Sequence, residues 1–156
     1  MKLLDWVVAN RPGNVSEYDD RYEIEHESGE HSTLFKNFCS PISDKSPLKT
    51  LGDVYCTFDG ADLFSSTFKI ASLVSPRSVE GVELVGSLHN FKDWLDKLYP
   101  SFSERVIPFM YQAVIGFYAI GEESGKIYEW DEEQGALSDE FDTLDKVLKE
   151  WLDAIS

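Results

Sequence analysis

The C-terminal segment, Val114 to Ser156, constrains the fold more than any other part of the chain. Its first part, Val114 to Gly121, is apolar and aromatic, which predicts a buried strand. A turn at Glu122 to Gly125 leads into an alternating second strand at Lys126 to Asp131. Glu132 to Glu140 is polar and acidic and contains a glycine, so we interpret it as a linking loop. The segment therefore predicts a hairpin followed by an acidic connection.

An amphipathic helix follows this connection. Its apolar residues recur at i, i+3, i+4, i+7, i+8 and i+11, a spacing that places them on one helical face: Leu144, Val147, Leu148, Trp151, Leu152 and Ile155. Asp142 or Thr143 can cap its N-terminus, and Asp145 near its start suits the helix dipole. We expect this helix to pack on the hairpin and to form the centre of the core with it.

Strands cluster in the middle of the chain, and helices lie between and after them. The predicted helices are Met1 to Ala9 and His89 to Tyr99, and the further predicted strands are Val54 to Phe58, Phe68 to Leu73 and Arg105 to Met110. Asp59-Gly60 is a strong turn signal, and Pro108 indicates a sheet edge or a bulge. This order predicts an α+β fold with a central, mostly antiparallel sheet packed by helices. A chain of 156 residues fits a single domain, residues 1–156.

The net charge of −15 is concentrated in two segments. Glu17 to Glu30 carries seven acids and one arginine, a net −6, and predicts an edge strand or a mobile loop. Glu122 to Ser156 carries twelve acids and three lysines, a net −9, so the rest of the chain is neutral. Nucleic acid and anionic membrane are poor partners, because phosphates require Lys and Arg. A basic protein is a favourable partner, since complementary charge speeds encounter; the alternative is that the acidity only keeps the protein soluble.

Nothing in the sequence indicates a membrane span or a secretory leader. No apolar run approaches the roughly 20 residues that cross a bilayer, and Asp5 interrupts the apolar N-terminus. Cys39 and Cys56 match no zinc-binding spacing, and two thiols do not make a disulfide framework. We therefore expect a cytoplasmic protein with buried free thiols and with neither a cofactor nor a metal.

No residue pattern for catalysis stands out. His26 and His31 could bind a metal weakly but are more simply explained as solvated surface residues. His89, near the start of a predicted helix, is expected to have no functional role. No serine has the Gly-x-Ser-x-Gly context of a nucleophile elbow. Gly121 to Lys126 lacks the first glycine of a P-loop, and its two glutamates would repel phosphate. The acids after Asp131 only faintly resemble a calcium loop, because the glycine comes one place early. We predict no catalytic residues and no enzyme.

Several aromatic and turn motifs follow one another between Leu48 and Ile155. They are Val54-Tyr55-x-x-Phe58-Asp59-Gly60-Ala61, Ile107-Pro108-Phe109, Gly116-Phe117-Tyr118-Ala119-Ile120, Lys126-Ile127-Tyr128-Glu129-Trp130-Asp131 after a turn at Gly125, and Phe141 before the terminal helix. In this order they resemble the SUKH superfamily (the Smi/Knr homology group), whose aromatic strand runs into an Asn-Gly or Asp-Gly turn. The match covers about two-thirds of the chain. Met1 to Pro47 departs from it, because the family's opening helix with a Leu-Pro step is missing.

The resemblance implies an α+β fold and a bacterial immunity protein. Such proteins bind and neutralise a cognate polymorphic toxin, often a nuclease, and nucleases carry basic surfaces that suit the two acidic segments. A regulatory scaffold of the Smi/Knr type is the alternative. A small enzyme is a further one, although the sequence shows no Ser or His with an oriented partner.

We expect the partner to bind near the acidic connection after the hairpin. The expected residues are Glu122, Glu123, Tyr128, Trp130, Asp131, Glu132, Glu133 and Asp139. The carboxylates would meet a basic protein, with Tyr128 or Trp130 as an aromatic anchor. The alternative is that these acids only hold a solvated turn and that Trp130 packs inward.

Overall fold

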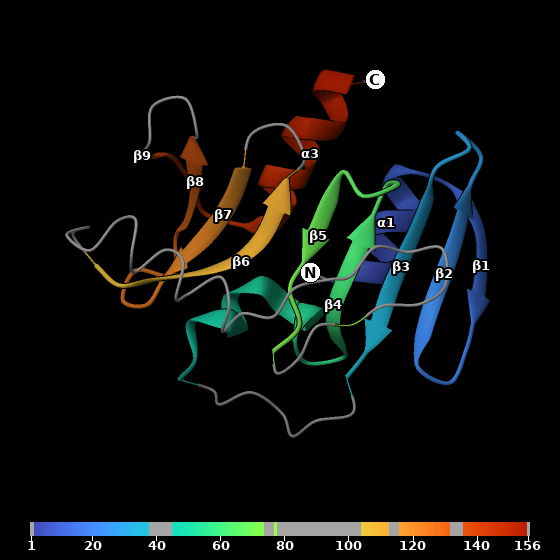
Figure 1. The fold of residues 1–156 in the computed structure, drawn as a ribbon, viewed down its shortest axis with the longest axis horizontal. Coiled ribbons are helices and arrows are strands. Elements are labelled where there is room, and N and C mark those ends of the chain that lie inside the picture. Colours follow the sequence, from blue (N-terminus) through green and yellow to red (C-terminus); the bar gives the residue numbers. More distant parts are fainter. Residues whose placement is uncertain are drawn as a thin grey trace.

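The computed structural model describes residues 2–37, 45–73, 77, 104–112, 116–131 and 136–155. Nine strands form one antiparallel sheet in which every strand pairs with the next one along the chain (Figure 1). The strands are β1 (Gly13–Glu17), β2 (Arg21–His26), β3 (His31–Lys36), β4 (Phe58–Leu63), β5 (Phe68–Ile70), β6 (Val106–Gln112), β7 (Gly116–Gly121), β8 (Ile127–Asp131) and β9 (Ala136–Phe141). The described helices are α1 (Leu3–Asn10), the 3-10 helix η1 (Pro47–Val54) and α3 (Leu144–Ile155). The predicted α+β class and antiparallel sheet are confirmed.

The inner face of the sheet carries the main core. A row of directly paired residues crosses six strands on this face: Tyr22, Leu34, Ala61, Ile70, Met110 and Tyr118. Facing residues of antiparallel strands lie on the same side of a sheet, so this row makes one continuous apolar surface. Both terminal helices pack against it, α1 through Leu3 and Val7, and α3 through Leu144, Val147, Leu148 and Leu152 of the predicted stripe.

Polar bonds fix the position of each helix on the sheet. The N–H of Leu3 donates to Asp53 Oδ1 at 2.7 Å, which ties the start of α1 to η1. The Trp151 indole N–H donates to the Tyr118 hydroxyl at 2.8 Å and so ties α3 to β7. Figure 1 shows α1 on the side of the sheet that holds β1 to β4, and α3 on the side that holds β6 to β9. The predicted capping role of Thr143 is wrong, because its hydroxyl oxygen is buried and has no hydrogen-bond partner in the structure.

A second buried cluster lies on the opposite, outer face of β6 to β8. It consists of Val106, Phe117, Ala119, Tyr128 and Trp130. The rings of Phe117 and Trp130 stack with centroids 5.4 Å apart and planes 8° from parallel. Strand alternation explains both clusters, since Tyr118 and Ile120 face inward while Phe117 and Ala119 face outward.

Several predicted elements of the C-terminal half are confirmed. The hairpin of β7 and β8 around the Glu122 to Gly125 turn, the strand β6 and the helix α3 all form. Pro108 lies in an interior strand, beside a register shift between Pro108 and Met110, so the bulge reading is correct. The predicted loop at Glu132 to Glu140 is wrong from Ala136 onward, because Ala136–Phe141 pairs with β8 as the edge strand β9, and residues 132–135 lie outside the described residues.

The predicted strand at Val54 to Phe58 and the turn at Asp59-Gly60 are also wrong. Val54 ends η1, residues 55–57 form a turn, and Asp59 and Gly60 lie inside the fully buried strand β4. Gly60 has φ of 92°, a conformation that glycine adopts within a strand at little cost. The Asp59 carboxylate accepts hydrogen bonds from the Ser72 hydroxyl at 2.8 Å and the Leu73 N–H at 2.7 Å. Asp59 and Gly60 can therefore lie in the core, because the carboxylate finds hydrogen-bond donors there and glycine tolerates the positive φ.

The predictions for the N-terminal half are confirmed only in part. The predicted helix at Met1 to Ala9 is confirmed as α1, whereas the acidic segment Glu17 to Glu30 contains strand β2 and the turns on either side of it. Cys56 is a free thiol but is exposed, so its predicted burial is wrong. Cys39 and the predicted helix His89 to Tyr99 lie outside the described residues. No helix in the described ranges is long and apolar enough to span a bilayer.

Candidate functional site

The outer face of the sheet changes character from one end to the other. One row of directly paired residues crosses seven strands on this face: Ser16, Glu23, Thr33, Asp62, Lys69, Tyr111 and Phe117. The row is polar over β1 to β5 and aromatic over β6 and β7. At the polar end of this row, hydroxyl, carboxylate and amino side chains from several strands lie side by side.

A hollow of about 500 Å³ lies over this polar end. We call it the acidic hollow and define it by Glu23, Glu25, Thr33, Asp62 and Ser65, which line it together with neighbouring side chains of β1 to β4 and the β4–β5 turn. Its volume falls within the roughly 300–1,000 Å³ of typical ligand pockets. Three carboxylates line it, and no lysine or arginine does so among the described residues.

The three carboxylates differ in how far they are already paired. Glu23 accepts a bond from the Arg21 guanidinium at 3.1 Å. Asp62 is buried and accepts bonds from the N–H and the hydroxyl of Ser66, both at 2.8 Å. Glu25 is exposed, and within the described part of the chain no ion pair or hydrogen bond reaches its side chain. Glu25 is therefore the carboxylate best placed to take an external cation.

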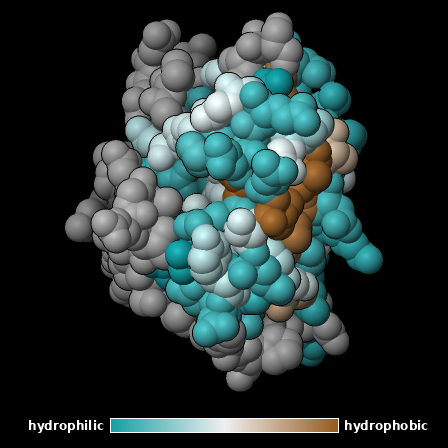
Figure 2. All heavy atoms as spheres, turned by 90° about the vertical axis from the view of Figure 1, so that its right-hand side faces the viewer, coloured by the Kyte–Doolittle hydropathy of each residue, from teal (hydrophilic) through white to brown (hydrophobic). Residues whose placement is uncertain are grey.

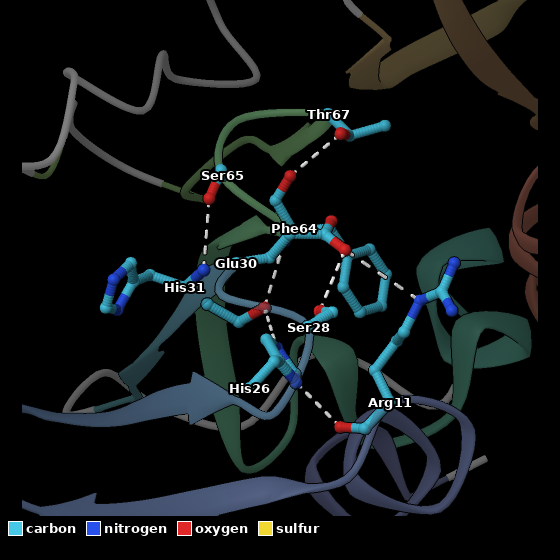
Figure 3. A network of polar contacts seen from close by, with 9 residues as sticks. Arg11, His26, Ser28, Glu30, His31, Phe64, Ser65 and Thr67 are labelled. Atoms are coloured by element: carbon cyan, nitrogen blue, oxygen red, sulfur yellow. Dashed lines mark hydrogen bonds and ion pairs between the residues drawn. The ribbon is translucent and has the colours of Figure 1, made fainter. Parts of the chain in front are cut away.

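The turn that borders the acidic hollow has an unusual backbone. Phe64, Ser65 and Ser66 have φ values of 56°, 52° and 67°, three successive non-glycine residues in the left-handed region. Each such residue costs on the order of 1 kcal/mol or more, so the surrounding contacts must hold the turn in place. The Ser65 N–H donates to the His31 carbonyl at 2.7 Å, and the His31 N–H donates to the Ser65 hydroxyl at 3.0 Å (Figure 3). This reciprocal pair positions Ser65 at the rim of the hollow.

A buried polar network lies beneath the hollow, on the inner face. His26 Nδ1 is 2.6 Å from the Arg11 carbonyl, and its Nε2 is 2.8 Å from the Ser32 hydroxyl (Figure 3). A carbonyl only accepts, so Nδ1 carries the proton, and in the neutral ring Nε2 accepts from Ser32. The Ser32 oxygen in turn accepts the Phe64 N–H at 2.9 Å. His26 is 3% exposed, which overturns its predicted place on the solvated surface; His31 is exposed as predicted.

The sequence does not predict this network, because its members come from different strands that only the fold brings together. Once β2 spans Arg21–His26, alternation puts His26 on the inner face with Ile24, two residues before it. That alternation is visible in the sequence, but the hydroxyl partner comes from a different strand. The structure thus contains the oriented Ser–His pair that the sequence alone does not reveal.

The structure scatters the residues predicted to bind a partner. Glu122 and Glu123 lie in the β7–β8 turn, and Glu122 is 3.8 Å from the exposed Arg105 guanidinium. Tyr128 and Trp130 are only 9% and 6% exposed, as expected if Trp130 packs inward. Asp131 and Asp139 belong to the backbones of β8 and β9, and Glu132 and Glu133 lie outside the described residues.

Glu104 organises the turn that holds the two glutamates. Its Oε1 accepts the N–H groups of Glu123 and Ser124, each at 3.1 Å, and its Oε2 accepts the Tyr128 hydroxyl at 3.0 Å. Burial raises the pKa of Glu104, but these hydrogen bonds outweigh burial, so its pKa lies below the ordinary value. The turn is thus held by internal carboxylate bonds.

The molecule presents its β1 edge as a mainly hydrophilic surface with a limited hydrophobic area (Figure 2). All but the first residue of β1 are exposed, and Val15 and Tyr18 are among the most exposed large apolar and aromatic side chains of the described residues. The Arg21 guanidinium lies 4.3 Å from the centre of the Tyr18 ring. The acidic hollow and this edge form one accessible surface.

The fold and site define an acidic α+β protein with a carboxylate-lined hollow on an antiparallel sheet. No protein-family model, curated protein or solved structure matches the chain. No group of three or more His, Cys, Asp or Glu side chains in the described ranges could hold a metal ion.

Proposed function

We propose that this chain is a non-enzymatic binding protein that captures a basic partner protein through the acidic hollow and the adjoining β1–β2 edge. The observation that carries the proposal is a hollow lined by three carboxylates and, among the described residues, by no lysine or arginine. The Glu17 to Glu30 segment, which includes Glu23 and Glu25, carries a net charge of −6. Complementary charge accelerates encounter and rejects like-charged partners.

The partner that best suits this surface is a basic, nuclease-type toxin, with the chain acting as a SUKH-type immunity protein in the cytoplasm. The support is the order of the aromatic motifs, of which those in β6, β7 and β8 form strands, whereas Asp59-Gly60 lies inside β4 and not in a turn. A regulatory scaffold of the Smi/Knr type would use the same acidic surface on a different partner. The identity of the bound protein separates the two.

The acidic hollow is a better candidate for the interface than the predicted C-terminal residues. Tyr128 and Trp130, the proposed anchors, are buried, and Glu122 lies beside Arg105. Glu25, by contrast, is exposed within a concave surface. Concave sites desolvate the contacts that they make, which strengthens charge-assisted bonds.

A small enzyme is the second candidate, because His26 and Ser32 form an oriented pair. Two observations oppose it. Ser32 is 1% exposed, and its oxygen already accepts the Phe64 N–H. A nucleophile has to reach its substrate, so we interpret this pair as structural.

The proposal is tested by expressing the chain together with the product of the gene directly upstream. We expect that product to be a basic toxin that the chain binds and neutralises, with an association rate that falls steeply as salt rises. Reversal of Glu23 and Glu25 to lysine should slow association by about tenfold or more and reduce cell survival, with the fold intact.

The matched control reverses Asp131, Glu132 and Glu133 to lysine. We expect this variant to protect cells nearly as well as the parent. Loss of protection only in this control would place the interface at the C-terminal acids, and the absence of binding to any basic protein would refute the proposal.

A further inference from the structure

The hydroxyl of Thr33 lies at the floor of the acidic hollow. Thr33 is 3% exposed, it lines the hollow, and no side-chain hydrogen bond to it is found within the described part of the chain. Its oxygen is not one of the fully enclosed, unpartnered polar atoms of the described residues, so the hydroxyl opens onto the hollow, where a ligand or a water can bond to it. The floor of the hollow therefore offers an unused donor and acceptor.

Acceptors flank this hydroxyl on both sides. Glu23 pairs directly with Thr33 across β2 and β3, and Asp62 pairs directly with it across β3 and β4. Directly paired side chains have Cβ atoms about 5 Å apart. Glu25 lies two residues further along β2 on the same face, about 7 Å away. Carboxylates accept only, so this arrangement calls for a ligand with several donors.

The rim of the hollow already binds one guanidinium from within the chain. Arg21 lies over the Tyr18 ring and bonds to Asp20 at 2.8 Å and to Glu23 at 3.1 Å. Stacking on an aromatic ring and multiple planar bonds to carboxylates suit arginine better than lysine. Beside Arg21, the side chains of Glu25 and Thr33 have no hydrogen-bond partner among the described residues.

We propose that the acidic hollow receives the guanidinium of an arginine side chain of the basic partner. Glu25 supplies the principal charge, and Thr33 accepts one of the remaining N–H groups at the floor. The inference rests on the proposed function, because it names the group by which that partner is held.

The test uses the full chain and Nα-acetyl-arginine amide as the probe. We expect NMR titration to shift the backbone signals of Thr33 and Glu25. Nα-acetyl-citrulline amide has the same shape without the charge, so it should bind at least tenfold more weakly. Nα-acetyl-lysine amide should also bind more weakly, because its ammonium group cannot bridge separated acceptors.

Two variants locate the bound group. Glu25→Gln should weaken binding of the arginine probe about tenfold, and Thr33→Val, which keeps the side-chain shape, about threefold or more. Glu27→Gln removes an equal charge from the neighbouring turn, outside the lining of the hollow, and should leave binding unchanged. Equal binding of the citrulline probe, or equal weakening by Glu25→Gln and Glu27→Gln, would overturn the inference.

The basic partner provides a second arm. If that partner binds the Thr33→Val and Glu25→Gln variants as tightly as the parent, arginine insertion is wrong although the proposed function stands. If the arginine probe binds as expected but no basic protein does, the guanidinium site stands and the proposed function fails.

Discussion

His26 is joined to two other elements through its two ring nitrogens and to a third element through Ser32. Its Nδ1–H donates to the carbonyl of Arg11 just after α1, and its Nε2 receives the Ser32 hydroxyl of β3. Ser32 then accepts the N–H of Phe64, at the start of the left-handed turn beside the acidic hollow. The packing of α1 and the shape of the turn are therefore linked through two buried side chains.

We predict that either truncation of this pair destabilises the protein. His26→Ala and Ser32→Ala should each lower the free energy of unfolding by about 1–3 kcal/mol, because each leaves buried polar groups without a partner. The double variant should cost less than the sum, since the two residues share one bond. Urea unfolding measures all three.

His31→Ala serves as the control, because His31 is exposed and its side chain makes no hydrogen bond to described residues. It should change the stability by less than about 0.5 kcal/mol. Equal, small effects of the His26 and His31 variants would show that the buried network contributes nothing.

Residue-level predictions from the sequence failed where burial depends on a distant strand. Asp59 and His26 are polar residues in turn-like or acidic contexts, yet both are buried and bonded across strands. Propensity describes the local chain, whereas the partners Ser72 and Ser32 are supplied by the tertiary fold. The acidic hollow was not predicted for the same reason, since four strands contribute to it.

Among the elements, the β7–β8 turn is sensitive to acid through Glu104. This carboxylate bonds to Glu123, Ser124 and Tyr128, and its pKa is lowered from the ordinary 4.5. A lowered folded-state pKa stabilises the protein above the unfolded value, and this stabilisation is lost as the pH falls through the folded-state value.

We predict that Glu104→Gln destabilises the protein at neutral pH and has a smaller effect in acid. The difference in unfolding free energy between parent and variant should shrink from about pH 5 downward. Urea unfolding of both proteins at several pH values measures it. Asp53 acts in the opposite direction, because burial, opposed by the bond from Leu3, raises its pKa above 3.8. Asp53 is present in both proteins, so a difference that is constant with pH would contradict the role of Glu104.

The predictions of helices and strands were correct where the hydrophobic periodicity is clear and extends over many residues. The helix α3 carries a six-residue stripe, and the hairpin of β7 and β8 has aromatic strands around a clear turn. They failed at β9, since Ala136–Phe141 has two acids and a serine among its six residues and lies in a polar, acidic stretch of sequence. An edge strand has only one neighbour and so needs little apolar character, which leaves a weak signal.

At the scale of the whole molecule, the sheet and its two terminal helices need no cross-link to hold together. A single core cluster extends from Leu3 in α1 to Leu152 in α3. We predict that a chelator and a reductant each leave the melting temperature unchanged within about 1 °C. Differential scanning calorimetry with EDTA and with dithiothreitol measures this. A fall of several degrees with either reagent would reveal a metal site or a disulfide that stabilises the fold.

The order of the strands has a consequence for the speed of folding. Most connections between successive strands are only a few residues long, and only the β3–β4 and β5–β6 connections are long. Short loops close with little entropic cost, so β1–β3, β4–β5 and β6–β9 can each form as a local block. Rates fall as contacts become more distant in sequence, which makes the two long closures the slow steps. A chain emerging from the ribosome can thus form the strands β1 to β5 before the strands β6 to β9 have been synthesised.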